Sequence, residues 1–230
     1  MSEMIGNAAY FGVTVSLAGY AVGLWIKKKV RKPFANPLLI AILLVMGLLV
    51  ALGIDYEIYN ESAKYLSYLL TPATVCLAIP LYQLLALLKK HWKAVVGGLT
   101  AGAASSLVSV LGLSMAFGLT HEQYVSLLPK SITTAIGMGL SEELGGIVTL
   151  TVAAIILTGV LGAVIGEAIC RLFRIKDRVA VGLAFGASAH AVGTSRALEI
   201  GEIEGAMSSL AIAVSGLITV VAASFFAGLY

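Results

Sequence analysis

The sequence predicts an all-α polytopic membrane protein, a helical bundle with two broken or re-entrant segments. Of its 230 residues, 59% are hydrophobic and 12% are charged, whereas soluble domains carry roughly 25% charged residues. The mean hydropathy is +0.98. Two stretches, 129–146 and 182–209, place glycines, hydroxyl residues and charges between long apolar runs, and lipid alone cannot surround such stretches. We expect one transmembrane domain over residues 1–230, since no polar stretch reaches the roughly 50 residues of a small domain.

The apolar runs are long enough to cross a bilayer, which takes roughly 20 helical residues. The predicted spans cover residues 8–26, 38–54, 65–88, 94–119, 147–166 and 206–229. Basic clusters follow the first, third and fifth spans, so the positive-inside rule makes those ends cytoplasmic. We therefore expect a multi-pass protein of the cell inner (plasma) membrane with its N-terminus outside. The start of the chain lacks the basic region of a secretory signal, so no cleavage is expected.

Prolines and small residues distinguish two of these spans from simple lipid-facing helices. Pro72 and Pro80 are expected to break the third span, because each removes a helical hydrogen bond. The fourth span, 94–119, is rich in glycine, alanine and serine, which favour close helix packing. Cys76 and Cys170 are isolated, with neither a disulfide framework nor a zinc-site spacing, and are interpreted as packing residues.

Two further apolar segments, near 127–140 and 179–192, are too short to span. The alternation of charge along the chain is consistent if each enters the membrane and returns to the side from which it came, the two from opposite faces. Gly137, Gly139 and Gly186 are the expected helix breaks within them. Such a pair of segments is what an inverted repeat produces, and inverted repeats are common in secondary transporters.

Ionisable residues within these segments are candidates for a functional site, because a charge at a helix centre in a membrane costs about 2.5–3.5 kcal/mol or more. Cations beside hydroxyl residues on interrupted helices suit a small carboxylate better than a metal. Arg196 can bind a carboxylate with two parallel hydrogen bonds, and Lys130 acts as a point charge. The predicted substrate-binding residues are Lys130, Ser131, Thr133, Thr134, Ser188, His190, Gly193, Thr194, Ser195 and Arg196, and the candidates for ion coupling are Glu142, Glu143 and His190.

Each of these residues also has a structural interpretation that the sequence leaves open. Lys130 can extend to the outer interface, and Arg196 can pair with Glu199 or Glu202. His190 can be a hydrogen-bonded interior residue, and Glu142 and Glu143 can cap the next helix.

Other function classes have little support in the sequence. Ser188 and His190 supply a nucleophile and a base, but they show no nucleophile elbow and no patterned acidic partner, so we predict no enzyme. The sequence shows no clustered metal ligands, and we expect no metal and no cofactor. The net charge of +3 comes from short basic clusters beside the spans, so no nucleic-acid partner is expected.

From residue 36 onward the chain resembles the LrgB/CidB family of antiholin-like proteins, which includes the plastidial glycolate/glycerate transporter. The resemblance is carried by LPKSITT (128–134), SEELGGI (141–147), LLTPATVCLAIPLY (69–82) and the long stretch GLAFGASAHAVGTSRALEIGEIEGAMSSLA (182–211). One position departs from the family pattern: Ala135 stands where a proline usually follows KSxTT, so Gly137 and Gly139 would have to supply the break.

The resemblance implies two functions from different classes. The first is a secondary transporter that carries a small monocarboxylate, such as glycolate, glycerate, lactate or pyruvate, by alternating access. The second is an antiholin-like regulator of murein hydrolase activity and cell lysis, acting with a small LrgA/CidA-like membrane partner. The cations and hydroxyls on broken helices favour the transporter. A homodimer is also expected, with the first spans as its scaffold.

Overall fold

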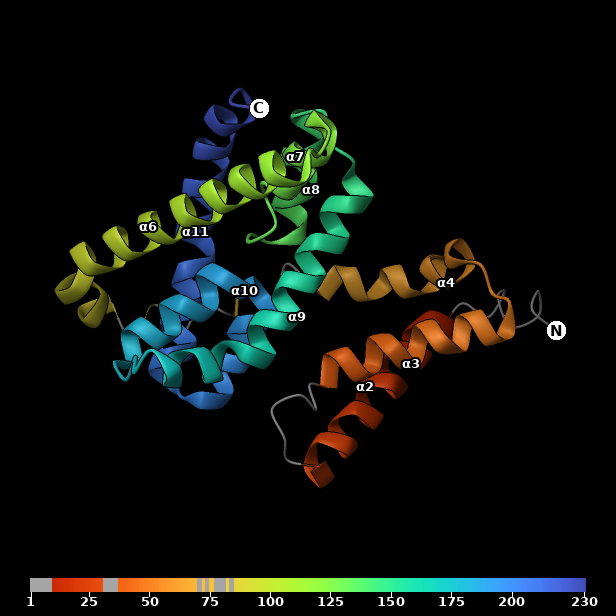
Figure 1. The fold of residues 1–230 in the computed structure, drawn as a ribbon. Helices are drawn as coiled ribbons and strands as arrows, with labels where there is room; N and C mark the ends of the chain where they lie inside the picture. The colour runs from red at the N-terminus through yellow and green to blue at the C-terminus, as the bar shows by residue number, and fades with distance from the viewer. Residues whose placement is uncertain (1–9, 31–36, 70–71, 73–74, 77–81, 83–84) are drawn as a thin grey trace. The chain divides into compact units, whose positions relative to one another are not determined.

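The computed structural model describes residues 10–30, 37–69, 72, 75–76, 82 and 85–230, and these residues form helices and no strand. The chain divides into two compact units, Met1–Cys76 and Leu77–Tyr230. The all-α prediction is therefore confirmed. Figure 1 traces the helices of both units.

The first unit is a group of helices held together through glycines. It contains α2 (Phe11–Val30), α3 (Pro37–Leu52), α4 (Tyr56–Ala63) and the 3-10 helix η1 (Lys64–Leu69). A Cβ on Gly23 would lie 2.5 Å from the carbonyl oxygen of Pro37, so α2 and α3 meet at backbone contact. The backbone N–H of Gly12 donates to Oγ of Ser62 at 2.7 Å, which fixes α4 against α2.

The second unit contains three helices that are long and apolar enough to cross a membrane: Lys89–Phe117, Val148–Leu172 and Glu202–Ala227. The first of these belongs to α6 (Leu85–Phe117), and the other two are α9 (Val148–Leu172) and α11 (Glu202–Ala227). The shorter helices α7 (His121–Leu127), α8 (Thr134–Glu143) and α10 (Arg178–Ile200) lie between them in the chain. These six helices build the candidate site.

The start of α6 differs from the expected boundary at residue 94. The helix begins at Leu85 and runs through Lys89, Lys90 and Lys93, because lysine is a good helix former and its charge need only lie beyond the apolar part of the helix. The helix ends at Phe117, where Gly118 adopts a φ of +60°, a left-handed conformation that glycine takes without strain.

The expected third span, 65–88, lies largely outside the described residues. Its first part is η1, and Pro72 is an exposed helical residue. Pro80 lies outside the described residues.

The helices between the three long ones lie toward opposite ends of the second unit, α7 and α8 at one end and α10 at the other (Figure 1). At one end α7 lies beside the C-terminus, where the Tyr124 hydroxyl donates to the Phe226 carbonyl at 2.7 Å. At the other end the start of α10 packs with the first halves of α6 and α11 around Val179, Val95 and Met207. The chain therefore runs along α6, returns along α9 and runs forward again along α11.

The contact of α10 with α11 depends on glycine, and replacing one glycine tests it. A Cβ on Gly186 would overlap the carbonyl oxygen of Ser208. We expect Gly186→Ala to destabilise the protein by about 1–3 kcal/mol through overpacking, which lowers Tm by roughly 2–10 °C for a chain of this size. Thermal unfolding of the detergent-purified protein measures the change.

Gly112→Ala is the matched control, because no atom lies within 4 Å of a Cβ at that position of α6. Its Tm should stay the same or rise slightly, since alanine favours the helix. Equal losses in the two variants would contradict close packing at Gly186.

Candidate functional site

The first broken segment is a helical hairpin made by α7 and α8, and buried hydroxyl groups hold it to α9. The chain after α8 returns to the end of α7, where the Ile147 N–H donates to Oγ of Ser126 at 2.7 Å. Thr151 of α9 donates to Oγ of Ser141 at 2.6 Å and lies 2.9 Å from the carbonyl oxygen of Ser126. The turn between the two helices, residues 128–133, therefore forms the tip of this hairpin.

Lys130 lies in this turn and makes hydrogen bonds to hydroxyl groups. Its ammonium donates to Oγ of Ser106 at 2.9 Å and to Oγ of Ser131 at 3.2 Å. The two hydroxyls lie 3.0 Å from each other. Among the described residues no carboxylate forms an ion pair with Lys130.

Lys130 lies far from both ends of α6. Ser106 follows Lys89 by 17 residues and precedes Phe117 by 11, which is about 25 Å and about 16 Å at a rise of 1.5 Å per residue. A cation at this depth does not extend to the end of the helix. This geometry disfavours the interpretation of Lys130 as an interfacial lysine.

The second broken segment is α10, which bends sharply at His190. His190 has φ 41° and ψ −133°, a non-helical conformation inside the helix, and positive φ is strained for a residue other than glycine. Both limbs of the bend then contact the same turn of α11. Gly186 on the first limb lies against the carbonyl of Ser208, and Thr194 on the second limb is hydrogen-bonded to Oγ of Ser208 at 2.7 Å.

An ion pair closes the base of this hairpin. The guanidinium of Arg178, the first residue of α10, donates to both carboxylate oxygens of Glu204 at 2.8 and 2.9 Å. Glu204 follows the end of α10 by four residues, so the segment starts and ends at the same place. The non-helical backbone lies at His190, four residues after Gly186, where the sequence predicted a break.

His190 packs at the tip of the α10 hairpin and is buried. Its Nε2 donates to the carbonyl of Ile155 on α9 at 2.9 Å. A Cβ on Gly159 would lie 2.5 Å from the imidazole, so this glycine makes room for the ring. The geometry is that of a hydrogen-bonded interior histidine that fastens α10 to α9.

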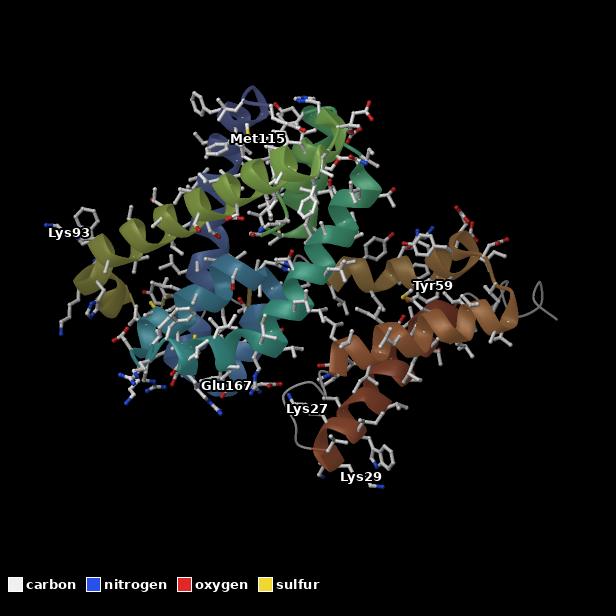
Figure 2. The ribbon with its side chains drawn as sticks, viewed as in Figure 1. Lys27, Lys29, Tyr59, Lys93, Met115 and Glu167 are labelled. Atoms are coloured by element: carbon white, nitrogen blue, oxygen red, sulfur yellow. The ribbon has the colours of Figure 1, made fainter. Side chains whose placement is uncertain are left out.

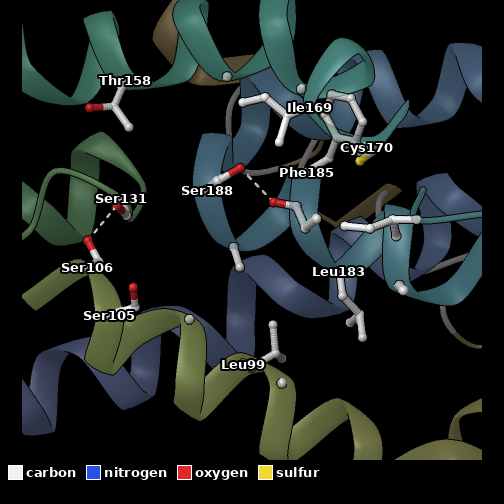
Figure 3. A pocket seen from close by; sticks show the side chains of 18 of the residues that line it. Leu99, Ser105, Ser106, Ser131, Thr158, Ile169, Cys170, Leu183, Phe185 and Ser188 are labelled. Carbon is white, nitrogen blue, oxygen red and sulfur yellow. Dashed lines mark hydrogen bonds between the residues drawn. The ribbon is translucent and has the colours of Figure 1, made fainter. Parts of the chain in front are cut away.

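A cavity of about 830 Å³ lies between α6, α9 and α10, with the Lys130 turn at one end. Hydroxyl groups of Ser106, Ser131, Thr158 and Ser188 gather around that end, as Figure 3 shows. The far end of the cavity is lined by residues at the start of α6 and α10, including His91 and Asp177.

A buried apolar cluster separates Lys130 from the opposite end of the unit. It is formed by Leu107, Val110, Tyr124, Val125, Leu128, Ile132, Leu140 and Ala223. The cavity therefore extends from Lys130 toward the start of α10, and the apolar cluster lies beyond Lys130 on the side of α7.

The predicted substrate residues fall into two groups. The cavity brings together Lys130, Ser131 and Ser188. The residues Thr133, Thr134, His190, Gly193, Thr194, Ser195 and Arg196 are not among those that line it. Of the ion-coupling candidates, Glu142 and Glu143 are exposed at the end of α8, and that helix is continuous through Ala135, Gly137 and Gly139.

Arg196 is held by carboxylates of the protein. It donates to Glu167 of α9 at 2.7 Å and to Glu199 at 2.5 Å. Glu167 also accepts from Arg171 at 3.1 Å and lies near the end of α9 (Figure 2). This is the structural interpretation that the sequence left open, with Glu167 as an additional partner.

Ser106 and Thr158 were not predicted as site residues. The serines of α6 were interpreted as packing residues because they lie among glycines and alanines. Their spacing contains a signal that could have found them: Gly98, Gly102 and Ser106 recur every four residues, so they share the face of α6 that lines the cavity. Thr158 stands alone in an apolar helix, and nothing near it in the sequence marks it.

The described residues contain no group of three or more His, Cys, Asp or Glu side chains that could hold a metal ion. Among the described residues the cavity is lined by the Lys130 ammonium, several hydroxyls, an apolar wall and, at the far end, His91 and Asp177.

Comparison with known proteins places this arrangement in a family. A profile described as the LrgB-like family matches residues 16–229. The chain belongs to the LrgB-like family. The antiholin-like protein LrgB of Bacillus mycoides (strain KBAB4) is 38% identical over 218 residues, which cover 94% of this chain and 95% of that protein. Those of Bacillus cereus (strain B4264) and Bacillus anthracis (strain CDC 684 / NRRL 3495) are 37% identical over the same shares. No solved structure matches the chain significantly.

The ion pair of Arg196 with Glu167 should be a measurable part of the stability of the hairpin. A double-mutant cycle with Arg196→Met and Glu167→Gln should give a coupling energy of about 0.5–1.5 kcal/mol, because the pair is partly shielded from solvent. Thermal or chemical unfolding of the four proteins measures it.

Arg171→Met is the control, because Arg171 contacts the same carboxylate but is 78% exposed. Its coupling to Glu167 should be smaller, as for other exposed pairs. A coupling near zero for Arg196 would show that its ion pair does not hold α10 to α9.

Proposed function

We propose that the protein is a secondary transporter of small monocarboxylates of the glycolate, glycerate, lactate or pyruvate class. The observation that carries this proposal is Lys130, a cation deep in the helical unit whose hydrogen-bond partners are Ser106 and Ser131. A charge in a membrane is costly without a partner. A carboxylate in the cavity supplies that partner, and the neighbouring hydroxyls supply further hydrogen bonds.

The proposed mechanism is alternating access. The cavity extends from Lys130 toward the start of α10, and the apolar cluster around Tyr124 and Leu128 lies on the other side of Lys130. Transport requires the opposite arrangement, in which that cluster separates and the cavity narrows. The hairpins α7–α8 and α10 are the elements proposed to move against α6 and α11.

We place the protein in the inner (plasma) membrane of the cell. In the proposed topology the N-terminus lies outside and the base of α10 lies in the cytoplasm. Arg171, Arg174, Lys176 and Arg178 precede or open α10, and cytoplasmic loops carry such residues in excess. The substrate would therefore reach Lys130 from the cytoplasm in this conformation. A homodimer remains part of the proposal.

Removing the charge of Lys130 should strongly weaken uptake. Charge-assisted hydrogen bonds contribute about 1.5–3 kcal/mol, so Lys130→Met should weaken apparent substrate affinity by roughly 10- to 100-fold. Uptake of labelled glycolate, glycerate, lactate and pyruvate into proteoliposomes measures this. Ser106→Ala should give a smaller loss, because it removes one neutral hydroxyl.

Lys93→Met is the matched control, since Lys93 is an exposed lysine of α6, the helix that carries Ser106, and does not line the cavity. It should transport like the unchanged protein. An apparent affinity that is unchanged in Lys130→Met would overturn the assigned role of Lys130, and absence of uptake of all four acids in the unchanged protein would overturn the transporter.

Single cysteines at Glu122 and Lys176 should be labelled from opposite sides of the membrane. They lie at the start of the two proposed re-entrant segments, Glu122 in the first turn of α7 and Lys176 two residues before α10. The background should carry serine in place of Cys76, which is exposed, and Cys170, which is buried. Labelling with a membrane-impermeant maleimide in oriented vesicles measures the sides, and labelling from one side would exclude the proposed topology.

An antiholin-like regulator is the second candidate, and the names of the Bacillus relatives favour it. In this function the protein acts with a small LrgA/CidA-like membrane partner on murein hydrolase activity and lysis. Lys130→Met separates the two functions. If lysis follows from carboxylate flux, the variant loses both transport and the lysis phenotype, whereas a partner-dependent regulator keeps its phenotype.

A further inference from the structure

The cavity is larger than a two-carbon or three-carbon acid requires. Its volume is about 830 Å³, within the roughly 300–1,000 Å³ of pockets that hold drug-sized ligands. A small acid bound at Lys130 would leave most of this volume to water. The residues that line the rest of the cavity therefore influence which carboxylates bind tightly.

The wall beyond the hydroxyl groups is apolar. Leu99 of α6, Leu161 and Ile165 of α9, and Leu183 and Phe185 of α10 line it. Figure 3 shows Ser106, Ser131 and Thr158 on one side and Leu183 and Phe185 on the other, with Ser188 between the two groups. The cavity thus has a cationic end at Lys130 and an apolar wall beyond it, and the far end is lined by His91 and Asp177.

The length of the apolar part follows from the helices. Ser106 and Leu99 are seven residues apart on α6, and Thr158 and Ile165 are seven residues apart on α9, which is about 10 Å on each. An extended chain advances about 1.2 Å per bond, from about 3.6 Å for the three bonds of a residue. The wall therefore accommodates a chain of about eight bonds by the same measure.

We propose that the cavity binds monocarboxylates with an unbranched apolar chain of about six to eight carbons, a length set by the 1.2 Å advance per bond. The carboxylate pairs with Lys130, and the chain lies along Leu99, Leu161 and Leu183 toward the end lined by His91 and Asp177. This inference rests on the proposed function, because it assigns the carboxylate to the same cation. It extends the ligand class from short hydroxy acids to amphipathic acids.

Charge and burial together select this class. Lys130 favours an anion and repels an alkylammonium ion, and an uncharged chain leaves the ammonium without an anionic partner. Each methylene transferred to the apolar wall contributes roughly 0.8 kcal/mol, which is about fourfold in Kd. Asp177, the carboxylate at the far end, accepts a hydrogen bond from the Ala180 N–H as the N-cap of α10.

The test is equilibrium binding of labelled acetate, butanoate, hexanoate and octanoate to the full chain in lipid nanodiscs, with empty nanodiscs subtracted. We expect Kd to fall about threefold to fourfold per added methylene up to about eight carbons. Lys130→Met should weaken binding of every acid by roughly 10- to 100-fold. Leu161→Ser should weaken octanoate severalfold and leave acetate unchanged.

Leu157→Ser is the matched control, because Leu157 is 62% exposed against 56% for Leu161, lies one turn away on α9 and does not line the cavity. It should bind all four acids like the unchanged protein. A Kd independent of chain length, equal effects of the two leucine variants, or an octanoate Kd that is unchanged in Lys130→Met would each overturn the inference. Failure of the transporter itself is read separately, from glycolate uptake, so the two failures are distinguishable.

Discussion

The backbone that leaves helical geometry inside an apolar bundle must find hydrogen-bond partners, and the second unit is built around this requirement. No water is available in the hydrocarbon region, so each unpaired N–H or C=O is costly. The α7–α8 segment meets it through the hydroxyls of Ser126, Ser141 and Thr151. At the tip of α10 the imidazole of His190 is bonded to the carbonyl of Ile155. These side chains make broken helices possible where lipid-exposed loops are not.

The same requirement explains how the cavity can exist. Glycines at positions 159, 182 and 186 bring α9, α10 and α11 close to one another or to the His190 ring, so packing there is tight. The face of α6 that carries Gly98 and Gly102 has no atom within 4 Å of a glycine Cβ. Tight contact on one face of the α10 hairpin thus accompanies open space on the other, and Lys130 borders that space.

The sequence predicted the fold class well because membrane spans depend on simple quantities, apolar length and flanking charge. The two broken segments were also anticipated, since a helix that faces only lipid has little use for clustered glycines, hydroxyls and charges. The site was harder. Arg196 and Lys130 look alike in sequence, because each is a cation beside hydroxyl residues. They differ in the structure because Arg196 forms an ion pair with Glu167, which lies 29 residues earlier in the chain. Only the tertiary structure shows that Arg196 has carboxylate partners and Lys130 has hydroxyl partners.

The α10 hairpin precedes in the chain the residues of α11 that it contacts, and this order has a consequence for biogenesis. Arg178, Gly186 and Thr194 all find their partners in the first two turns of α11, which leave the ribosome after the hairpin does. Until α11 is synthesised, Arg178 lacks the carboxylate of Glu204, and the two limbs of the strained bend at His190 lack their contacts with Ser208. We therefore expect the hairpin to enter the membrane together with α11, late in synthesis, so that the bilayer accepts two chain reversals and one span as a single event.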